Sequence, residues 1–506
     1  DGRSYLISSN EINEPTSESA KQILFGDLHV HSTFSLDAFL GNLPIVRGEG
    51  VHPVSDACNF ARFCSNLDFF AITDHAEWLT SREWKDTISS VQDCAFASRD
   101  SDNPPIIPLL GWEWTQKSIN KSSHYGHKNV ILRSIESDAI PLRPIGAEGK
   151  FFENLLNMPV STMLYASLYD FKNRQNYFNV MHRKLITNNL NRCSADKPVR
   201  DLPVDCIERA ISPEVLFNKL DDWGYDAIVI PHGTAWGNSA PPLAAWDTQL
   251  NKKDHNQNYQ KLIELYSGHG NTEEYRSWRT LNNNKEALSC PQPSPGFIPE
   301  CHQAGEIIRE RCRVAAGPSE ECDKRARAAR QNYVSVNPFG LLTVPGSDPE
   351  EWLNSGQCLD CFLPAFNYRP QMSAQYALAI RDFTSGEPEG YRFGFIGSSD
   401  NHQSRPGTGY KEVLRYLNSD SKYSSKNNFL LSMGPKKEPQ LPSTKILDLK
   451  KFEDRISMPR KAGRISSFLY TGGLVAAHSK SRNRQALWNS MDSREVYATS
   501  GDRILL

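Results

Sequence analysis

Short apolar runs alternate with stretches of helical period along most of the chain. The runs have the length and the β-branched and aromatic content of strands, and they lie at 23–30, 68–73, 106–115, 127–132, 225–232, 262–266, 393–397, 473–477 and 495–498. Stretches typical of helices lie at 55–65, 81–98, 152–183, 212–220, 304–332, 376–383 and 484–491. Residues 33–54 lack a steady period and predict a long loop. Strands that alternate with helices indicate a parallel α/β architecture.

Most of the apolar runs end or begin with a side chain that can bind a metal ion. His29 and His31 stand two residues apart at the end of the first run, so their imidazoles share one face of the strand. Imidazoles mixed with carboxylates suit zinc, manganese or iron better than calcium or magnesium. Barrels of parallel strands place their chemistry at the C-terminal strand ends, which predicts a multinuclear site there. The candidate ligands are His29, His31, Asp37, His75, Glu113, His127, His232, Asp400 and His402.

Further residues near these positions are candidates for supporting roles. Asp27 and Asp74 are expected to accept the free ring N–H of ligand histidines. Lys128 and Arg405 stand beside ligands and are expected to neutralise a substrate phosphate, although each also reads as an ordinary solvated cation. Another predicted strand ends in a motif that contains Glu264 and His269. These two residues are candidates for substrate binding or acid catalysis, with a packing role as the alternative.

The charge balance gives no global reason to expect nucleic acid or an anionic membrane as a partner. The chain has 57 basic and 59 acidic residues and a formal charge of −2. Any phosphate chemistry must therefore come from a local site. No stretch approaches the roughly 20 apolar residues needed to cross a bilayer, so we expect no transmembrane segment. The chain starts at Asp1 without Met, which fits a removed leader or a trimmed terminus.

Cysteine content predicts disulfides and an oxidising compartment. Six of the eleven cysteines crowd into one segment between 290 and 361, as expected for an insertion stapled by disulfides. Zinc is the alternative, but only Cys358 and Cys361 have the short spacing of a zinc site. The odd total leaves at least one free thiol. These features favour an extracytoplasmic, periplasmic or secreted, protein.

The pattern divides the chain into one large domain with insertions. Residues 1–22 form a polar lead-in, 23–274 the first part of the domain and 275–356 a Cys-rich insertion. The domain continues at 357–412, is interrupted by a polar lysine-rich insertion at 413–462, and ends with 463–506. A chain of 506 residues is long enough to bury a large core in such an arrangement.

The ligand motifs resemble those of a known superfamily. His29-Val-His31, Asp37, Thr73-Asp74-His75, Glu113, His127, Pro231-His232-Gly and Asp400-Asn-His402 match, in order, the motifs of the PHP (polymerase and histidinol phosphatase) superfamily. The opening Gly-Asp-Leu-His-Val-His-Ser and the ending Arg-Glu-Val-Tyr-Ala-Thr-Ser-Gly look most like its large, poorly characterised, often extracytoplasmic branch. The resemblance extends over residues 23–501.

This resemblance implies a distorted (β/α)7 TIM-like barrel with two large insertions and two or three divalent ions (Zn, Mn or Fe) in its mouth. By the same resemblance, His29, His31, Glu113 and Asp400 hold the first ion. Glu113 also joins the second ion, with His127 and His232. The third ion is implied for Asp37, His75 and His402, where Asp37 replaces a histidine of some relatives.

Clustered divalent ions suit hydrolysis. They bridge and deprotonate a water near neutral pH and stabilise attacking and leaving oxygens, and Glu113 is expected to hold two of them together. The sequence therefore predicts a metal-dependent phosphoesterase that acts on a small phosphate mono- or diester. One alternative is a hydrolase of another ester, an amide or a lactone that uses the same metals. The other is a non-catalytic metal-binding or surface-assembly protein.

Overall fold

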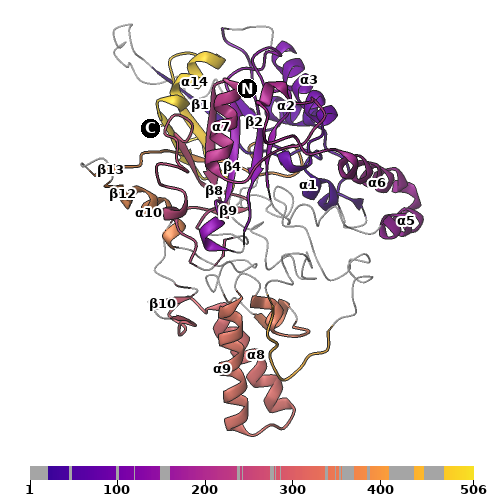
Figure 1. The fold of residues 1–506 in the computed structure, drawn as a ribbon, viewed down its shortest axis with the longest axis vertical. Coiled ribbons are helices and arrows are strands. Elements are labelled where there is room, and N and C mark those ends of the chain that lie inside the picture. The colour runs from indigo at the N-terminus through magenta and orange to yellow at the C-terminus, as the bar shows by residue number, and fades with distance from the viewer. Residues whose placement is uncertain are drawn as a thin grey trace, which may run out of the picture.

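A curled, mixed sheet of seven strands forms the centre of the protein in the computed structural model (Figure 1). In spatial order its strands are β16 (Val496–Thr499), β15 (Leu474–Ser479), β1 (Gln22–Asp27), β2 (Phe69–Ile72), β3 (Ile107–Thr115), β4 (His127–Leu132) and β7 (Ala227–His232). The structure describes residues 21–44, 48–97, 102–118, 120–148, 160–235, 240–241, 243–273, 279, 281–284, 287–336, 340–347, 349–352, 355, 370–383, 388–408, 438–448 and 472–506. Residues 1–20 of the predicted lead-in and most of the predicted insertion at 413–462 lie outside these residues.

The expected parallel (β/α)7 barrel is wrong. Within the main sheet only the β1–β2 and β2–β3 pairs are parallel, whereas β3–β4, β4–β7, β1–β15 and β15–β16 pair antiparallel. The main sheet is an open, curled half-barrel. Strands β3 and β4 are joined without a crossover helix, and such a connection returns the chain antiparallel.

A second, three-stranded sheet lies against the main one. In it β8 (Leu262–Ser267) pairs in parallel with β14 (Gly394–Gly397) and antiparallel with β9 (Gly270–Asn271). The Val229 amide donates to the Tyr259 carbonyl at 2.9 Å, and the Gly473 amide donates to the Ser398 carbonyl at 2.8 Å. These bonds join the segments beside β8 and β14 to β7, at one edge of the main sheet, and to the residue before β15, close to the other edge.

Helices cover the main sheet through their apolar faces. They are α2 (Val54–Phe63), α3 (Ser81–Ala97), α7 (Pro213–Trp223) and α14 (Arg484–Asp492). For α7, the Ser212 hydroxyl accepts a bond from the Val215 amide at 3.3 Å, and Gly224 with φ of 70° ends the helix. Its buried face packs into the same core as β2 and β3, which are buried along their whole length.

Four disulfides among the described residues confirm the prediction that the cysteines form disulfides. They join Cys58 to Cys94, Cys193 to Cys206, Cys290 to Cys301 and Cys312 to Cys322. Among the described residues Cys64 is a free thiol. The remaining pair, Cys358 and Cys361, lies outside the described residues.

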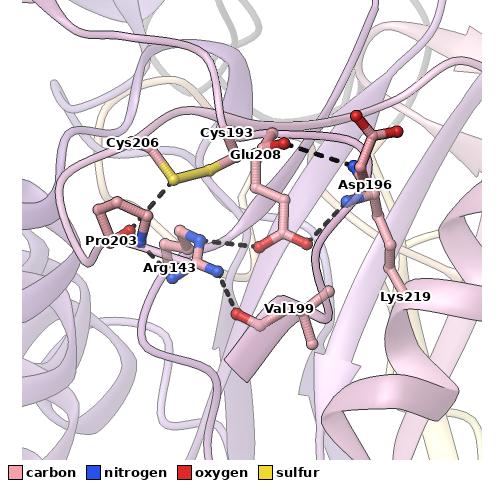
Figure 2. The surroundings of a disulfide bond; sticks show 9 residues. Arg143, Cys193, Asp196, Val199, Pro203, Cys206, Glu208 and Lys219 are labelled. Carbon is pink, nitrogen blue, oxygen red and sulfur yellow. Dashed lines mark hydrogen bonds and ion pairs between the residues drawn. A yellow bond between two sulfur atoms is a disulfide. The ribbon is translucent and has the colours of Figure 1, made fainter. Parts of the chain in front are cut away.

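One disulfide closes the loop beside a small two-stranded sheet. In Figure 2, Cys193–Cys206 lies next to the buried Arg143–Glu208 ion pair, whose Nε–Oε2 distance is 2.9 Å. Lys219 adds a second cation to Glu208 at 3.1 Å. Strands β5 (Ile145–Ala147) and β6 (Glu208–Ala210) pair here in parallel, with Ile145 opposite Glu208.

Two helical hairpins stand away from the sheets (Figure 1). The stretch predicted as one helix at 152–183 is α5 (Val160–Tyr169) and α6 (Arg174–Asn189), and the one at 304–332 is α8 (Glu300–Val314) and α9 (Ser319–Ser335). Gly317 and Pro318 separate the last two helices. The predicted loop at 33–54 contains α1 (Leu36–Gly41). The remaining short elements are α10 (Ala374–Ala379), β10 (Asn282–Asn284), β11 (Ala287–Ser289), β12 (Arg381–Asp382) and β13 (Glu389–Gly390).

Of the helices in the described part of the chain, none is both long enough and apolar enough to span a membrane.

Candidate metal centre

Backbone pairing after the strands brings two ligand segments together. The Asp400 amide donates to the His29 carbonyl at 2.8 Å, and the His31 amide donates to the Asn401 carbonyl at 2.8 Å. The segment after β14 therefore runs beside the segment after β1. Asp400 has φ of 51°, a left-handed conformation that is uncommon outside glycine and that tends to occur at functional sites.

The main sheet supplies the next ligands from neighbouring strands. The Glu113 amide donates to the Asp74 carbonyl at 3.0 Å, and His75 forms a β-bridge with Glu113. His127 and His232 are direct partners in the antiparallel pairing of β4 with β7. The end of β7 and the start of β4 therefore lie at the same edge of the sheet as the ends of β2 and β3.

Glu113 lies at the centre of the site, between two sets of imidazoles. Its side chain is buried, at 1% exposure. Oε1 lies 2.9 Å from His127 Nδ1 and 3.3 Å from His232 Nε2. The other oxygen, Oε2, lies within 3.5 Å of three more ring nitrogens: His29 Nε2, His31 Nε2 and His75 Nδ1.

The remaining predicted ligands complete the arrangement. Asp400 Oδ1 lies 3.2 Å from both His29 Nε2 and His31 Nε2. Asp37 Oδ2 lies 3.0 Å from His75 Nε2 and 3.5 Å from His402 Nε2. All nine predicted ligands are thus brought into one cluster.

Four overlapping groups in this cluster could hold a metal ion, because the ligand atoms within each group lie within 4.8 Å of one another. Three of the groups consist only of predicted ligands. The fourth adds His269, which follows β8 and is half-buried, and whose ring centroid lies 4.4 Å from that of His402. The groups are His29–His31–Asp400, His29–Glu113–His232, His31–His75–His402 and His269–Asp400–His402.

The hydrogen-bonding of the buried atoms fits bound cations. His29 Nε2, His31 Nε2 and Asp400 Oδ1 converge without a hydrogen-bond partner, as does Glu113 Oε1. Buried polar atoms in proteins are normally paired, and a metal ion could serve as the partner of these convergent atoms. Nitrogen-rich donors with a few carboxylates are those that zinc, manganese and iron prefer.

Electrostatics in the metal-free site follow from the same proximity. Burial opposes ionisation of Glu113, but the imidazoles of His75 and His232 outweigh it and hold the pKa of this carboxyl well below its usual range. Burial likewise opposes a charged His29, yet Asp400 and Glu264 raise the pKa of this imidazole well above its usual value.

Two ligand histidines are oriented by groups behind them. Glu264 is fully buried, and His29 Nδ1 lies 2.9 Å from its Oε2. His31 Nδ1 lies 2.8 Å from Ser35 Oγ, and the same hydroxyl donates to Asp74 Oδ1 at 2.7 Å. Contacts of this kind fix which ring nitrogen is left to bind a metal.

A third oriented ligand is His75, whose Nδ1 lies 2.6 Å from Thr115 Oγ1. The sequence reasoning missed both Ser35 and Thr115. For Ser35 the sequence gives a weak indication, since this residue stands four positions after His31 at the start of α1. For Thr115 the indication is its place as the last residue of β3, two positions after Glu113, because alternate residues of a strand share one face.

Asp27 and Asp74 are placed differently from the expectation. The carboxylate of Asp27 accepts bonds from the backbone amides of Ser399 at 3.1 Å and Gly407 at 2.7 Å. Asp74 accepts from the amide of Ser32 at 2.8 Å and reaches His31 only through Ser35. Both aspartates hold the ligand-bearing loops in place through these contacts.

The two predicted phosphate-binding cations have other partners. Lys128 is fully buried, and its Nζ donates to the Tyr125 carbonyl at 2.5 Å and to Gln249 Oε1 at 2.7 Å. Burial lowers the pKa of this amine to about 7. The guanidinium of Arg405 pairs with Glu49.

Fold and site together define a mixed α/β protein with a buried cluster of histidines and carboxylates that could hold metal ions. The chain belongs to the family described as proteins of unknown function, DUF3604, whose model matches residues 18–276 and 377–506. No curated protein and no solved structure matches it. The unmatched residues 277–376 overlap most of the predicted insertion at 275–356, and the predicted domain boundaries stay predictions.

Proposed function

We propose that the protein is a metal-dependent phosphoesterase that acts on a small phosphate ester. The observation that carries this proposal is the position of Glu113, whose two oxygens face separate sets of imidazoles. A carboxylate in this position suits two ions held close together. The order of the ligands along the chain, which resembles that of the PHP superfamily, supports the same reading.

Two or three divalent ions, zinc, manganese or iron, would occupy the site. His29, His31 and Asp400 would hold the first, with Glu113 shared. His127 and His232 would join Glu113 around the second, and a third would lie among Asp37, His75 and His402. Such ions supply an activated water and stabilise charge on a phosphoryl group.

The residues at the more open edge of the site would meet the substrate. The side chain of His127 is 26% exposed and that of Asp37 is 37% exposed, whereas His29 and His31 are fully buried. His269 is half-buried beside His402. In this proposal His269 donates a proton to the leaving oxygen, and Glu264 positions His29 from behind.

The four disulfides support an extracytoplasmic location, because disulfides persist in oxidising compartments. The substrate would then be a phosphate ester available outside the cytoplasm.

A panel of aryl phosphate monoesters, diesters and acyl esters, assayed with Mn or Zn, tests the proposal. We expect turnover of phosphate esters, and a fall of about 10²-fold or more in Glu113→Gln if this carboxylate holds two ions. Turnover of acyl esters alone would assign the protein to carbonyl hydrolysis. A metal-loaded protein that turns over none of these substrates would indicate a non-catalytic role.

A further inference from the structure

The helical hairpin formed by α5 and α6 presents apolar side chains to solvent. Of the 22 large apolar side chains that are exposed among the described residues, eight lie between 160 and 185. The most exposed are Leu168 at 73%, and Tyr169 and Phe171 at 61% each. The others are Val160, Leu164, Tyr165, Phe178 and Leu185.

Helix α5 is apolar on its inner and its outer face. Met163 and Ala166 point inward and pack in one cluster with Tyr177 of α6. Leu164 and Leu168, one turn apart, lie on the exposed side. The helix contains no charged residue. A helix of this kind is normally covered on both sides, by protein or by lipid.

The hairpin is also a local cationic surface in a chain of net charge −2. Between residues 160 and 189 the one acidic residue is Asp170, which accepts a bond from the Tyr177 hydroxyl at 2.6 Å. Of the four Lys and Arg residues there, Arg183 is buried and paired with Glu83, which leaves Lys172, Arg174 and Lys184 to contribute to the surface. Lys172 and Arg174, at the turn between the helices, are exposed. Apolar and aromatic side chains flanked by exposed cations are typical of elements that lie in the interface of an anionic bilayer.

The hairpin is firmly attached to the rest of the protein. Arg183 of α6 donates to the carbonyls of Thr33 at 3.0 Å and Trp78 at 3.2 Å, and it pairs with Glu83 at 3.1 Å. The cluster that contains Met163 also includes Phe39 of α1. In Figure 1 the hairpin extends from this attachment to the outer edge of the molecule.

We propose that the outer face of the α5–α6 hairpin, defined by Leu164, Leu168, Phe171, Lys172 and Arg174, docks on the surface of an anionic membrane. The apolar side chains enter the acyl boundary, and the two cations bind lipid phosphates. Pairing with a second copy fits less well where the two-fold axis passes near the turn, because such a contact would bring the two cationic turns together.

Co-sedimentation of the full-length protein with vesicles tests this proposal. Vesicles of phosphatidylcholine with phosphatidylglycerol are compared with pure phosphatidylcholine, at low and high salt. We expect binding to the anionic vesicles that weakens as salt rises. Leu168→Gln with Phe171→Gln should weaken this binding by about tenfold or more, since both side chains would leave the acyl region. Lys172→Glu with Arg174→Glu should abolish the preference for anionic lipid.

A matched control uses apolar side chains that are equally exposed elsewhere. Phe63 of α2 is 73% exposed and Phe96 of α3 is 79% exposed, and Phe63→Gln with Phe96→Gln should leave vesicle binding unchanged. Absence of vesicle binding by the unaltered protein would overturn the proposal, as would equal loss in the control. Self-association in sedimentation velocity that Leu168→Gln with Phe171→Gln removes, without vesicle binding, would assign the face to a protein contact instead.

Discussion

Replacing Glu264 by glutamine is expected to weaken metal binding without removing a ligand. Glu264 lies in β8 with no exposed surface, and its Oε2 is 2.9 Å from His29 Nδ1. The other ring nitrogen of His29 faces Asp400 Oδ1 at 3.2 Å. A carboxylate at Nδ1 keeps the proton there and leaves the Nε2 lone pair for the metal.

The magnitude follows from what the substitution changes. Glutamine keeps the volume of the side chain but loses its charge, and its amide N–H₂ is able to donate to Nδ1 of His29, which would place the ring proton on Nε2. Loss of such a partner typically costs 10- to 100-fold in metal affinity, or about 1.4 to 2.8 kcal/mol. We expect Glu264→Gln to fall in this range.

The assay is a competition titration of the chelator-stripped protein with zinc and a chromophoric chelator, together with elemental analysis. Glu300→Gln provides a matched control, because Glu300 is a buried glutamate of α8 that accepts a bond from the Tyr333 hydroxyl. Equal metal affinity in Glu264→Gln, Glu300→Gln and the unaltered protein, with the fold intact by circular dichroism, would refute the orienting role of Glu264.

Three further predictions test the site and the fold. His269→Asn should keep the full metal content while lowering kcat by about 10² to 10⁴, more for poor leaving groups, and loss of an ion on elemental analysis would make His269 a ligand. Burial favours neutral His75, yet Asp37 raises its pKa to about 9. The ion pair between Asp37 and His75 therefore stabilises the metal-free protein fully below pH 6.5, and this stabilisation is lost as the pH rises to about 9. The melting temperature of the metal-free protein should fall across this pH range, while the affinity for zinc should rise. Cys58→Ala with Cys94→Ala opens a loop of sequence separation 36 and should cost about 4 kcal/mol in denaturant unfolding, whereas a change under about 1 kcal/mol would contradict the loop-closure account.

Most of the predicted ligands could be recognised because they stand at or close to the end of a short buried strand; Asp37, in α1, is an exception. Phe69–Ile72 and Ile107–Thr115 are buried throughout, and an apolar run of this kind marks a strand whatever its neighbours are. A histidine or carboxylate directly after such a run is seldom needed for packing, so its position indicates a role in binding or catalysis. The cluster of the nine predicted ligands therefore did not depend on the predicted barrel being right.

The partners behind the ligands could not be predicted in the same way. Glu264 reaches His29 across 235 positions of sequence, through the packing of the second sheet against the main one. The bonds of Lys128 to Tyr125 and Gln249 depend on how distant segments pack around its buried amine, and the sequence pattern does not show this packing. From the sequence alone, the position of Lys128 next to the predicted ligand His127 therefore indicated a contact with the substrate.

The position of His127 already carried information on strand direction. Among the ligands in the main sheet, Glu113 and His232 lie at or near the C-terminal ends of their strands, whereas His127 is the first residue of β4. Strand β4 must therefore run opposite to its neighbours if its ligand is to reach the same edge, and it pairs antiparallel with both β3 and β7. An apolar run that begins with a ligand is thus evidence against an all-parallel barrel, because in such a barrel the N-terminal strand ends lie at the opposite mouth.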